Sequence, residues 1–332
     1  MTTSAARHAS EPDRAKREPP RVSVVVPARD EEAHIHACVR SILEQELEGG
    51  VEVVVADGCS GDRTAERARA AGAVVVPNPA GTTPAGLNAA LRRARGEIVV
   101  RFDAHAEMPP GYLAACVRAL DRQPGAPVCV GGWRRVAGRG PWGRATAAAL
   151  ASRFGVGNPR IWRSPDDGDG PVEVDTVALG AWFADRLRAL GGWNERYVRN
   201  QDFELNYRLR RSGGRVVFDP EVWSIYRPRE SPAALARQYW DYGRFKAMLL
   251  ADQPASLRPR QLAPVGLVAT VVAAALPGPT RRPARAALGL YGLTVGAVAA
   301  RSRAGWRTAA VLATMHLAWG AGLVAGFVRG QR

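Results

Sequence analysis

Three short acidic stretches each follow a run of strand-forming residues, and the third has the residue types of a metal or acid–base site. In VRFDAHAEMPP, residues 100–110, Asp103 and His105 lie two positions apart, and Glu107 follows at the same step. A carboxylate placed after a strand can bind a divalent cation that bridges two phosphates. On spacing alone, however, a D-x-H triplet is a weak signal, and a polar turn that ends a strand is the favoured interpretation.

The other two acidic stretches also have a structural and a chemical interpretation. In PARDEE, Asp30 and Glu31 stand where a helix is expected to begin, and the helix macrodipole alone would favour acids there. In ADGCSGDRT, Asp57 precedes a Gly-rich turn, where its carboxylate can accept hydrogen bonds from a base or a ribose. Asp62 further along this turn is expected to be a helix N-cap.

Alternating strand and helix patterns position these turns. Valine-rich runs predict strands at 22–26, 51–56 and 73–77 and a fourth strand that ends at Asp103, whereas helical spacing predicts helices at 31–46, from 64 to about 71 and at 84–95. Further on we expect a strand at 128–136, a helix at about 201–212 and a strand at 215–218. This alternation is typical of an α/β fold with a parallel sheet wrapped by helices. Because ligands bind beyond the carboxyl ends of such strands, the acidic turns should gather at one edge.

The positive charge of the chain is concentrated near its end. The net charge is +15, and residues 251–332 contain ten arginines but a single acid, Asp252. These arginines flank apolar blocks, which suits contact with a membrane surface better than a groove for nucleic acid. We therefore expect a membrane partner and no nucleic acid.

Three apolar segments, near 262–278, 284–300 and 308–328, make residues 251–332 a predicted membrane-associated helical region. The third segment is long enough to span a bilayer, and the other two are marginal. A buried helical hairpin in a soluble domain is the alternative. Arginines separate all three segments, so the positive-inside rule disfavours three spans, and the middle segment is expected to be interfacial or re-entrant.

The cysteines and the N-terminal residues indicate where in the cell the protein is expected to be. The four cysteines show no CxxC pair and no metal-ligand spacing, which favours a reduced, cytoplasm-facing domain. Together with the apolar segments this predicts a location at the cell membrane. Residues 1–20 are rich in Ala, Arg, Glu and Pro and contain no apolar core of a signal peptide. We expect them to form a disordered tail.

Four segments in chain order resemble the successive motifs of family 2 glycosyltransferases: VSVVVPARDEE, VEVVVADGCSGDRT, TPAGLNAALRRARGEIVVRFDAHA and NQDFELNYRLRRSGGRV. The resemblance covers roughly residues 21–250. The D-A-H form and the downstream YGRFK are most similar to the succinoglycan-type transferases that build exopolysaccharide on a lipid carrier. The resemblance implies a GT-A fold, a nucleotide-sugar donor (usually a UDP-sugar), Mg2+ or Mn2+ as cofactor, and inversion at the anomeric carbon.

The resemblance also implies roles for residues of the first two turns. Pro27, Ala28 and Glu31 match the segment that lines the nucleotide pocket of the family. Asp57 matches the acid that contacts the base.

In the third turn, Asp103 matches the first aspartate of the family's D-x-D motif, which lies by the ribose and the metal. His105 stands where the motif usually has its second aspartate, the direct metal ligand. Imidazole can ligate Mn2+, but it is neutral and softer than a carboxylate. A histidine in place of the aspartate is therefore expected to change the affinity of the site for metal and the metal that it prefers. A contribution from Glu107 stays open.

The catalytic base of the family lies in an E-D pair, which appears here as Gln201-Asp202. Asp202 therefore matches the base that takes the proton from the acceptor hydroxyl. The alternative is a structural role, because acids are favourable at the beginning of a helix. Glu204 is a second candidate for the base, although its spacing also suits an ion pair with Arg208.

Two later segments concern the acceptor. LGGWNERY matches the loop that shapes the acceptor pocket, where Trp193 either stacks on a sugar or packs inside the domain. RQYWDYGRFK lacks the Q-x-x-R-W motif of processive synthases, which argues against a polymerase. Arg244 and Lys246 in this segment either reach a diphosphate or belong to a solvated, membrane-facing helix.

The sequence thus predicts an inverting glycosyltransferase that moves a sugar from a nucleotide-sugar to a polyprenyl-linked or glycan acceptor in cell-surface polysaccharide synthesis. The alternative is a non-catalytic nucleotide- or glycan-binding scaffold, which His105 and Gln201 would favour. A nucleotidyltransferase is disfavoured, because no Gly-rich phosphate loop with Lys or Arg follows Val26.

Overall fold

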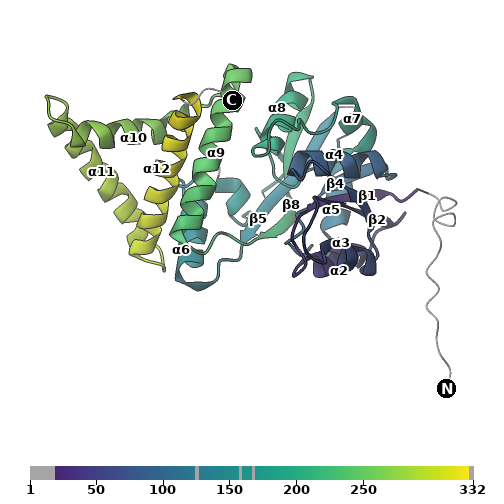
Figure 1. Ribbon diagram of the computed structural model, residues 1–332. Coiled ribbons are helices and arrows are strands. Elements are labelled where there is room, and N and C mark those ends of the chain that lie inside the picture. The colour runs from purple at the N-terminus through teal and green to yellow at the C-terminus, as the bar shows by residue number, and fades with distance from the viewer. Residues whose placement is uncertain (1–18, 124–126, 157–158, 167–168, 329–332) are drawn as a thin grey trace.

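The computed structural model describes residues 19–123, 127–156, 159–166 and 169–328 (Figure 1). It consists of an α/β part built on one sheet and a group of long helices near the C-terminus. The predicted tail at 1–20 lies almost entirely outside the described residues.

The sheet has eight strands in the order β3-β2-β1-β4-β7-β5-β8-β6. The strands are β1 (Val22–Ala28), β2 (Val51–Asp57), β3 (Val74–Pro77), β4 (Ile98–Arg101), β5 (Val128–Val136), β6 (Val172–Glu173), β7 (Ala181–Phe183) and β8 (Arg215–Tyr226). β1 pairs in parallel with β2 and β4, whereas β7 is antiparallel to both β4 and β5. The carboxyl ends of β1, β2 and β4 therefore meet at one edge, as the sequence predicted, and the carboxyl end of β5 lies at the same edge.

Helices cover both faces of this sheet, with α2 and α3 below it and α4 and α7 above it in Figure 1. The helices of this part are α2 (Ile35–Leu43), α3 (Thr64–Ala70), α4 (Thr83–Arg93), α5 (Tyr112–Asp121), α6 (Gly140–Ala151), α7 (Ala184–Ala189) and α8 (Gln201–Arg211). Val24 and Val26 of β1 belong to the core on one face, and Val25 belongs to the core on the other. Burial on both faces explains why the strand is an uninterrupted valine run.

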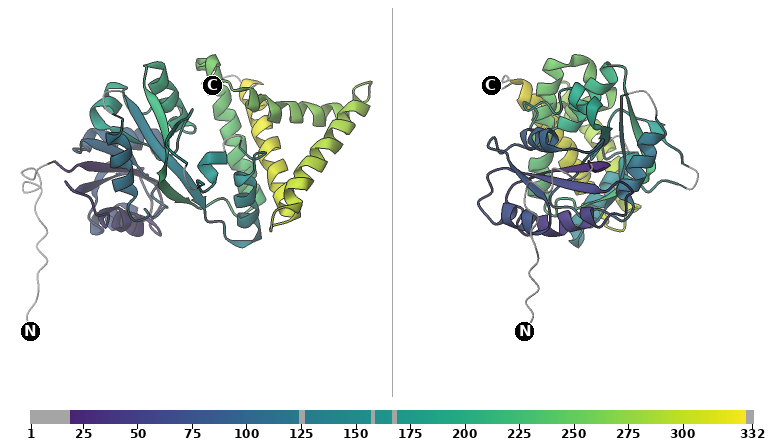
Figure 2. Two further views of the ribbon diagram at one scale, coloured as in Figure 1. Left: turned by 180° about the vertical axis from the view of Figure 1, so that it is seen from behind. Right: turned by 90° about the vertical axis from the view of Figure 1, so that its right-hand side faces the viewer.

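The C-terminal part contains α9 (Pro232–Asp252), α10 (Leu262–Ala275), α11 (Arg281–Ala300) and α12 (Trp306–Val328). α9 and α12 lie side by side, while α10 and α11 extend outward and close a triangle with α12 (Figure 2). Gly243 of α9 and Gly322 of α12 make this close approach possible, because a β-carbon at either position would clash with the backbone of the facing helix.

The three predicted apolar segments are thus three helices. Among the described residues, α12 alone is long and apolar enough to cross a membrane. One side of it is covered by protein, however, because Leu312 and Met315 pack with residues of α6 and α9 in a third hydrophobic cluster.

Candidate active site

A cleft of about 1600 Å³ opens at the carboxyl edge of the sheet and is bounded on its far side by the C-terminal helices. It is lined by six of the residues singled out in the sequence: Pro27, Ala28, Glu31, Asp103, His105 and Asp202. These residues come from β1, from the turns after β1 and β4, and from the first turn of α8. The structure therefore brings the first turn, the third turn and the expected base into one site.

The first two acidic turns are bound to each other. The backbone N–H of Gly61 donates to Oδ1 of Asp30 at 2.8 Å, and the N–H of Glu31 donates to the hydroxyl of Thr64 at 2.8 Å. Asp57 is engaged within its own turn, where Oδ1 accepts from the hydroxyl of Ser60 at 2.6 Å. Asp30 and Asp57 thus stabilise the loops, and the side chain of Glu31 is free to face the cleft.

Arg101, the last residue of β4, joins the two central acids. Its Nη2 donates to Oδ1 of Asp103 at 3.1 Å, and its Nη1 pairs directly with Oδ2 of Asp202. Nη2 of Arg134, on β5, lies 3.7 Å from the second oxygen of Asp103. Burial raises the pKa of Asp103, but the charges of the two arginines prevail and lower it below its ordinary value. Asp103 is therefore an anion in the cleft.

Asp202 is held at one oxygen only. Its Oδ1 is buried and has no hydrogen-bond partner among the described residues. Asn200, just before α8, adopts the left-handed conformation at φ 61° and donates to the carbonyl of Tyr242 at 3.3 Å, which fixes the start of the helix. Asp202 thus lines the cleft with a carboxylate that Arg101 holds at one oxygen.

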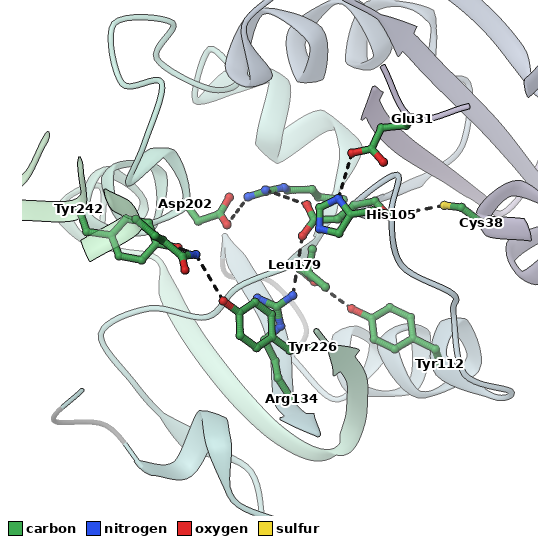
Figure 3. A network of polar contacts seen from close by, with 12 residues as sticks. Glu31, Cys38, His105, Tyr112, Arg134, Leu179, Asp202, Tyr226 and Tyr242 are labelled. Carbon is green, nitrogen blue, oxygen red and sulfur yellow. Dashed lines mark hydrogen bonds and ion pairs between the residues drawn. The ribbon is translucent and has the colours of Figure 1, made fainter. Parts of the chain in front are cut away.

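The side chain of His105 lies beside that of Glu31 (Figure 3). The distance between Nδ1 of His105 and Oε1 of Glu31 is 3.3 Å. The hydrogen bond to Glu31 raises the pKa of His105, partly offset by burial. Glu107, by contrast, is exposed and pairs with Arg227 at 3.3 Å, so it turns away from Asp103 and His105.

The side chains fit a metal that protein and substrate hold together. The described residues contain no group of three or more His, Cys, Asp and Glu that could enclose an ion. Asp103 and His105 would supply two ligands, which would suit an ion whose remaining ligands are diphosphate oxygens and water. A carboxylate beside Nδ1, as Glu31 provides, is the usual way to direct Nε2 of a histidine toward a metal.

Three residues expected at the site lie elsewhere. Asp57 is at the carboxyl edge but does not line the cleft. Trp193 is 1% exposed and packs edge-to-face on Trp182, because its backbone N–H is bound by Asn88 and the preceding glycines turn the chain inward. Arg244 is exposed on α9, lies over the ring of Phe245 and does not line the cleft. For Trp193 the packing alternative is the correct one.

Glu204 is removed as a candidate for the base by its own ion pair. Its two oxygens accept from Nε and Nη2 of Arg208 at 3.0 and 2.9 Å, and its side chain is 2% exposed. The predicted i,i+4 pair is confirmed.

The sequence analysis missed Arg101 and Arg134. Arg101 is the one charged residue in the buried strand β4, and that was the available signal. No comparable signal marked Arg134, because the position of its side chain depends on stacking over Tyr226. The centre of that ring lies 4.6 Å from the guanidinium (Figure 3). Further arginines line the same cleft and were also missed: Arg139, Arg153, Arg199, Arg227, Arg229 and Arg260.

Comparisons with known proteins agree with this geometry. Residues 23–179 match the family described as Glycosyl transferase family 2. Succinoglycan biosynthesis protein ExoA of Rhizobium meliloti (strain 1021) is 29% identical over 324 residues, which cover 90% of this chain and 92% of that protein. The mannosyltransferase PcManGT from Pyrobaculum calidifontis, solved with GDP-Man and Mn2+, matches 95% of this chain and 89% of its own with a TM-score of 0.65 and 24% identity.

The sheet, its helices and the cleft at its carboxyl edge show the GT-A fold. Within that fold, residues 23–179 are similar to the family 2 glycosyltransferases, as the motifs predicted.

Proposed function

We propose that this protein is a metal-dependent inverting glycosyltransferase. It moves a sugar from a nucleotide-sugar, with a UDP-sugar as the expected donor, to a lipid-linked or glycan acceptor. One observation carries the proposal. Asp103 and Asp202 face one cleft, and Oδ1 of Asp202 has no partner among the described residues. The similarity to a succinoglycan biosynthesis protein supports a role in the synthesis of cell-surface polysaccharide.

The donor would lie along the edge formed by β1 and β4. Pro27, Ala28 and Glu31 would line the nucleotide pocket, and Asp103 and His105 would hold Mg2+ or Mn2+. When bound, the ion neutralises charge on the diphosphate leaving group. Arg134 points its guanidinium at Asp103 from the other side and would attract the same diphosphate.

The transfer would be a single displacement. The carboxylate of Asp202 takes the proton of the acceptor hydroxyl, and the hydroxyl oxygen forms a bond to C1 of the donor sugar. The bond between C1 and the diphosphate oxygen breaks, and its electron pair leaves with the nucleoside diphosphate. Attack from the face opposite the leaving group inverts the configuration at C1. A single carboxylate base suffices, which agrees with the engagement of Glu204 by Arg208.

The composition of the cleft supports a lipid-linked acceptor. Four of its arginines form no ion pair with an acid among the described residues: Arg139, Arg153, Arg199 and Arg229. On the side of the C-terminal helices the cleft is walled by apolar residues, among them Leu267, Val295, Met315 and Trp319. Free cationic groups beside an apolar wall suit a molecule that joins phosphate to a hydrocarbon chain.

The outer helices support contact with a membrane. Leu276, Leu290 and Leu293, at the end of α10 and on α11, are 56%, 67% and 73% exposed. Arg281, Arg282 and Arg285 at the start of α11 add positive charge beside them, and residues 253–332 contain no acid. We infer that the α10–α11 hairpin contacts anionic lipid, so that residues 251–332 anchor a cytoplasmic catalytic domain at 21–250.

The alternative function is a scaffold that binds nucleotide without turnover, which the histidine at 105 and the glutamine at 201 would favour. Transfer from common UDP-sugars to lipid extracts, measured with and without Mn2+, distinguishes the two. Metal-dependent transfer supports the enzyme. Binding of UDP without transfer from any donor would support the scaffold.

A further inference from the structure

The side chain of Arg101 is buried, at 7% exposure, and both of its terminal nitrogens contact acids of the site. It lies at the end of a strand whose other residues, Ile98, Val99 and Val100, are fully buried and apolar. Placing a guanidinium there carries a large desolvation penalty unless both of its ends are paired. Its two carboxylate partners therefore determine where Arg101 lies, and Arg101 in turn determines where they lie.

The contact with Asp202 is specific to one oxygen. Oδ2 pairs with Arg101, while Oδ1 is buried and unpaired among the described residues. An arginine that holds one oxygen of a carboxylate fixes the plane of the group and hence the direction of the other oxygen.

Arg134 provides an internal comparison. It also approaches Asp103, at 3.7 Å, but no contact between Arg134 and Asp202 occurs in the described part of the chain. Its guanidinium stacks over Tyr226 instead. Of the two arginines that pair with Asp103, only Arg101 also reaches Asp202.

We propose that Arg101 is the positioning residue for Asp202: by holding Oδ2 it fixes the carboxylate at the wall of the cleft where the acceptor hydroxyl must bind, and it acts on transfer through Asp202. The proposal rests on the proposed role of Asp202 as the base. Loss of Arg101 leaves the carboxylate free to rotate, and a misplacement of about 1 Å lowers a rate by about 100-fold.

A double-mutant cycle tests this role. Arg101→Gln is made in the wild-type and in the Asp202→Asn background, and kcat is measured with radiolabelled donor in the full-length protein. We expect Arg101→Gln to lower kcat by about 100-fold in the wild type. In the Asp202→Asn background the same change should lower kcat by a clearly smaller factor, because only the contact of Arg101 with Asp103 is then lost.

Arg134→Gln in the same two backgrounds is the matched control, and it should lower kcat by the same factor in both. Binding of UDP, measured by calorimetry, verifies that each variant is folded. If Arg101→Gln does not bind UDP, Arg101→Lys replaces it, since lysine retains the charge but lacks the fork that spans two carboxylates.

An equal loss from the Arg101 substitution in both backgrounds, or no loss in the wild type, would overturn the positioning role. Failure of the proposed function gives a different result. In that case Asp202→Asn is as active as the wild type, or the wild type itself transfers no sugar.

Discussion

Nδ1 of His105 lies 3.3 Å from a carboxylate oxygen of Glu31, although the two residues are 74 positions apart and follow different strands. The pairing occurs because β1 and β4 are parallel neighbours, so the turns that follow them lie side by side. It changes the role expected of Glu31. The structure places its carboxylate against the imidazole, where it can orient His105 toward a metal.

The metal requirement should therefore depend on His105. Removing a ligand or the group that orients it typically lowers metal affinity 10- to 100-fold. We expect Glu31→Gln to raise the Mn2+ concentration for half-maximal transfer by about that factor, and His105→Ala to raise it by at least as much. Glu107→Gln, which changes an exposed acid paired with Arg227, is the control and should leave the requirement unchanged. A wild-type Mn2+ requirement in His105→Ala would exclude His105 as a ligand.

Lys246 should make stability depend on pH. Its Nζ is buried, donates to the carbonyl and the hydroxyl of Ser256 at 3.1 Å each, and lies 4.2 Å from the ring centre of Phe203. Burial, with the nearby charges of Arg258 and Arg260, lowers the pKa of Lys246 to about 8. An unfolded lysine stays protonated to about pH 10.4. Between these values the unfolded chain binds more protons, so the free energy of unfolding rises with pH.

Lys246→Met removes this dependence. Between pH 8 and 9.5 the free energy of unfolding of the wild type should rise by about 1.5 kcal/mol relative to that of Lys246→Met. Chemical denaturation in detergent at pH 7, 8 and 9.5 measures the difference. If wild type and variant respond to pH in parallel, Lys246 does not titrate in this range.

Trp193 should matter for stability and not for the choice of acceptor. It is buried against Trp182 and bound through its backbone by Asn88. Truncating a buried tryptophan costs about 3–5 kcal/mol, so Trp193→Ala should unfold at a lower temperature, and Trp193→Phe should lose less. A change in acceptor preference in a variant that unfolds at the wild-type temperature would instead place Trp193 at the acceptor.

The α10–α11 hairpin should determine membrane binding. Replacing Leu290 and Leu293 together by serine removes exposed apolar surface without touching the cores. Sedimentation with vesicles that contain anionic lipid should then show at least a tenfold loss of binding, and neutral vesicles should bind the wild type less well. Wild-type binding by the double variant would locate the membrane contact elsewhere, for example on α12.

The central part of the fold could be predicted because its signals are local. Valine runs and polar turns give β1, β2 and the order of the acidic loops, and parallel pairing brings those loops together. The short strand β7 was not predicted, because its three residues acquire their role only by pairing with both β4 and β5.

The sequence predicted those candidate site residues that lie in motifs. It missed residues whose place in the site depends on contacts between distant segments. Asp103 and Asp202 were expected, but the arginine that joins them was not, since its pairing depends on the placement of α8 against β4. Trp193 looked equally suitable for a pocket or a core, and only the contact with Trp182 distinguishes the two.

The most direct measurement for the central claim compares wild type with Asp202→Asn in transfer from UDP-sugars to lipid-linked acceptors. Loss of a general base lowers kcat by about 10²- to 10⁴-fold, and binding of UDP should persist because Asp202 acts on the acceptor. The account predicts metal-dependent transfer by the wild type and that loss in Asp202→Asn. Transfer by Asp202→Asn at the wild-type rate would contradict it.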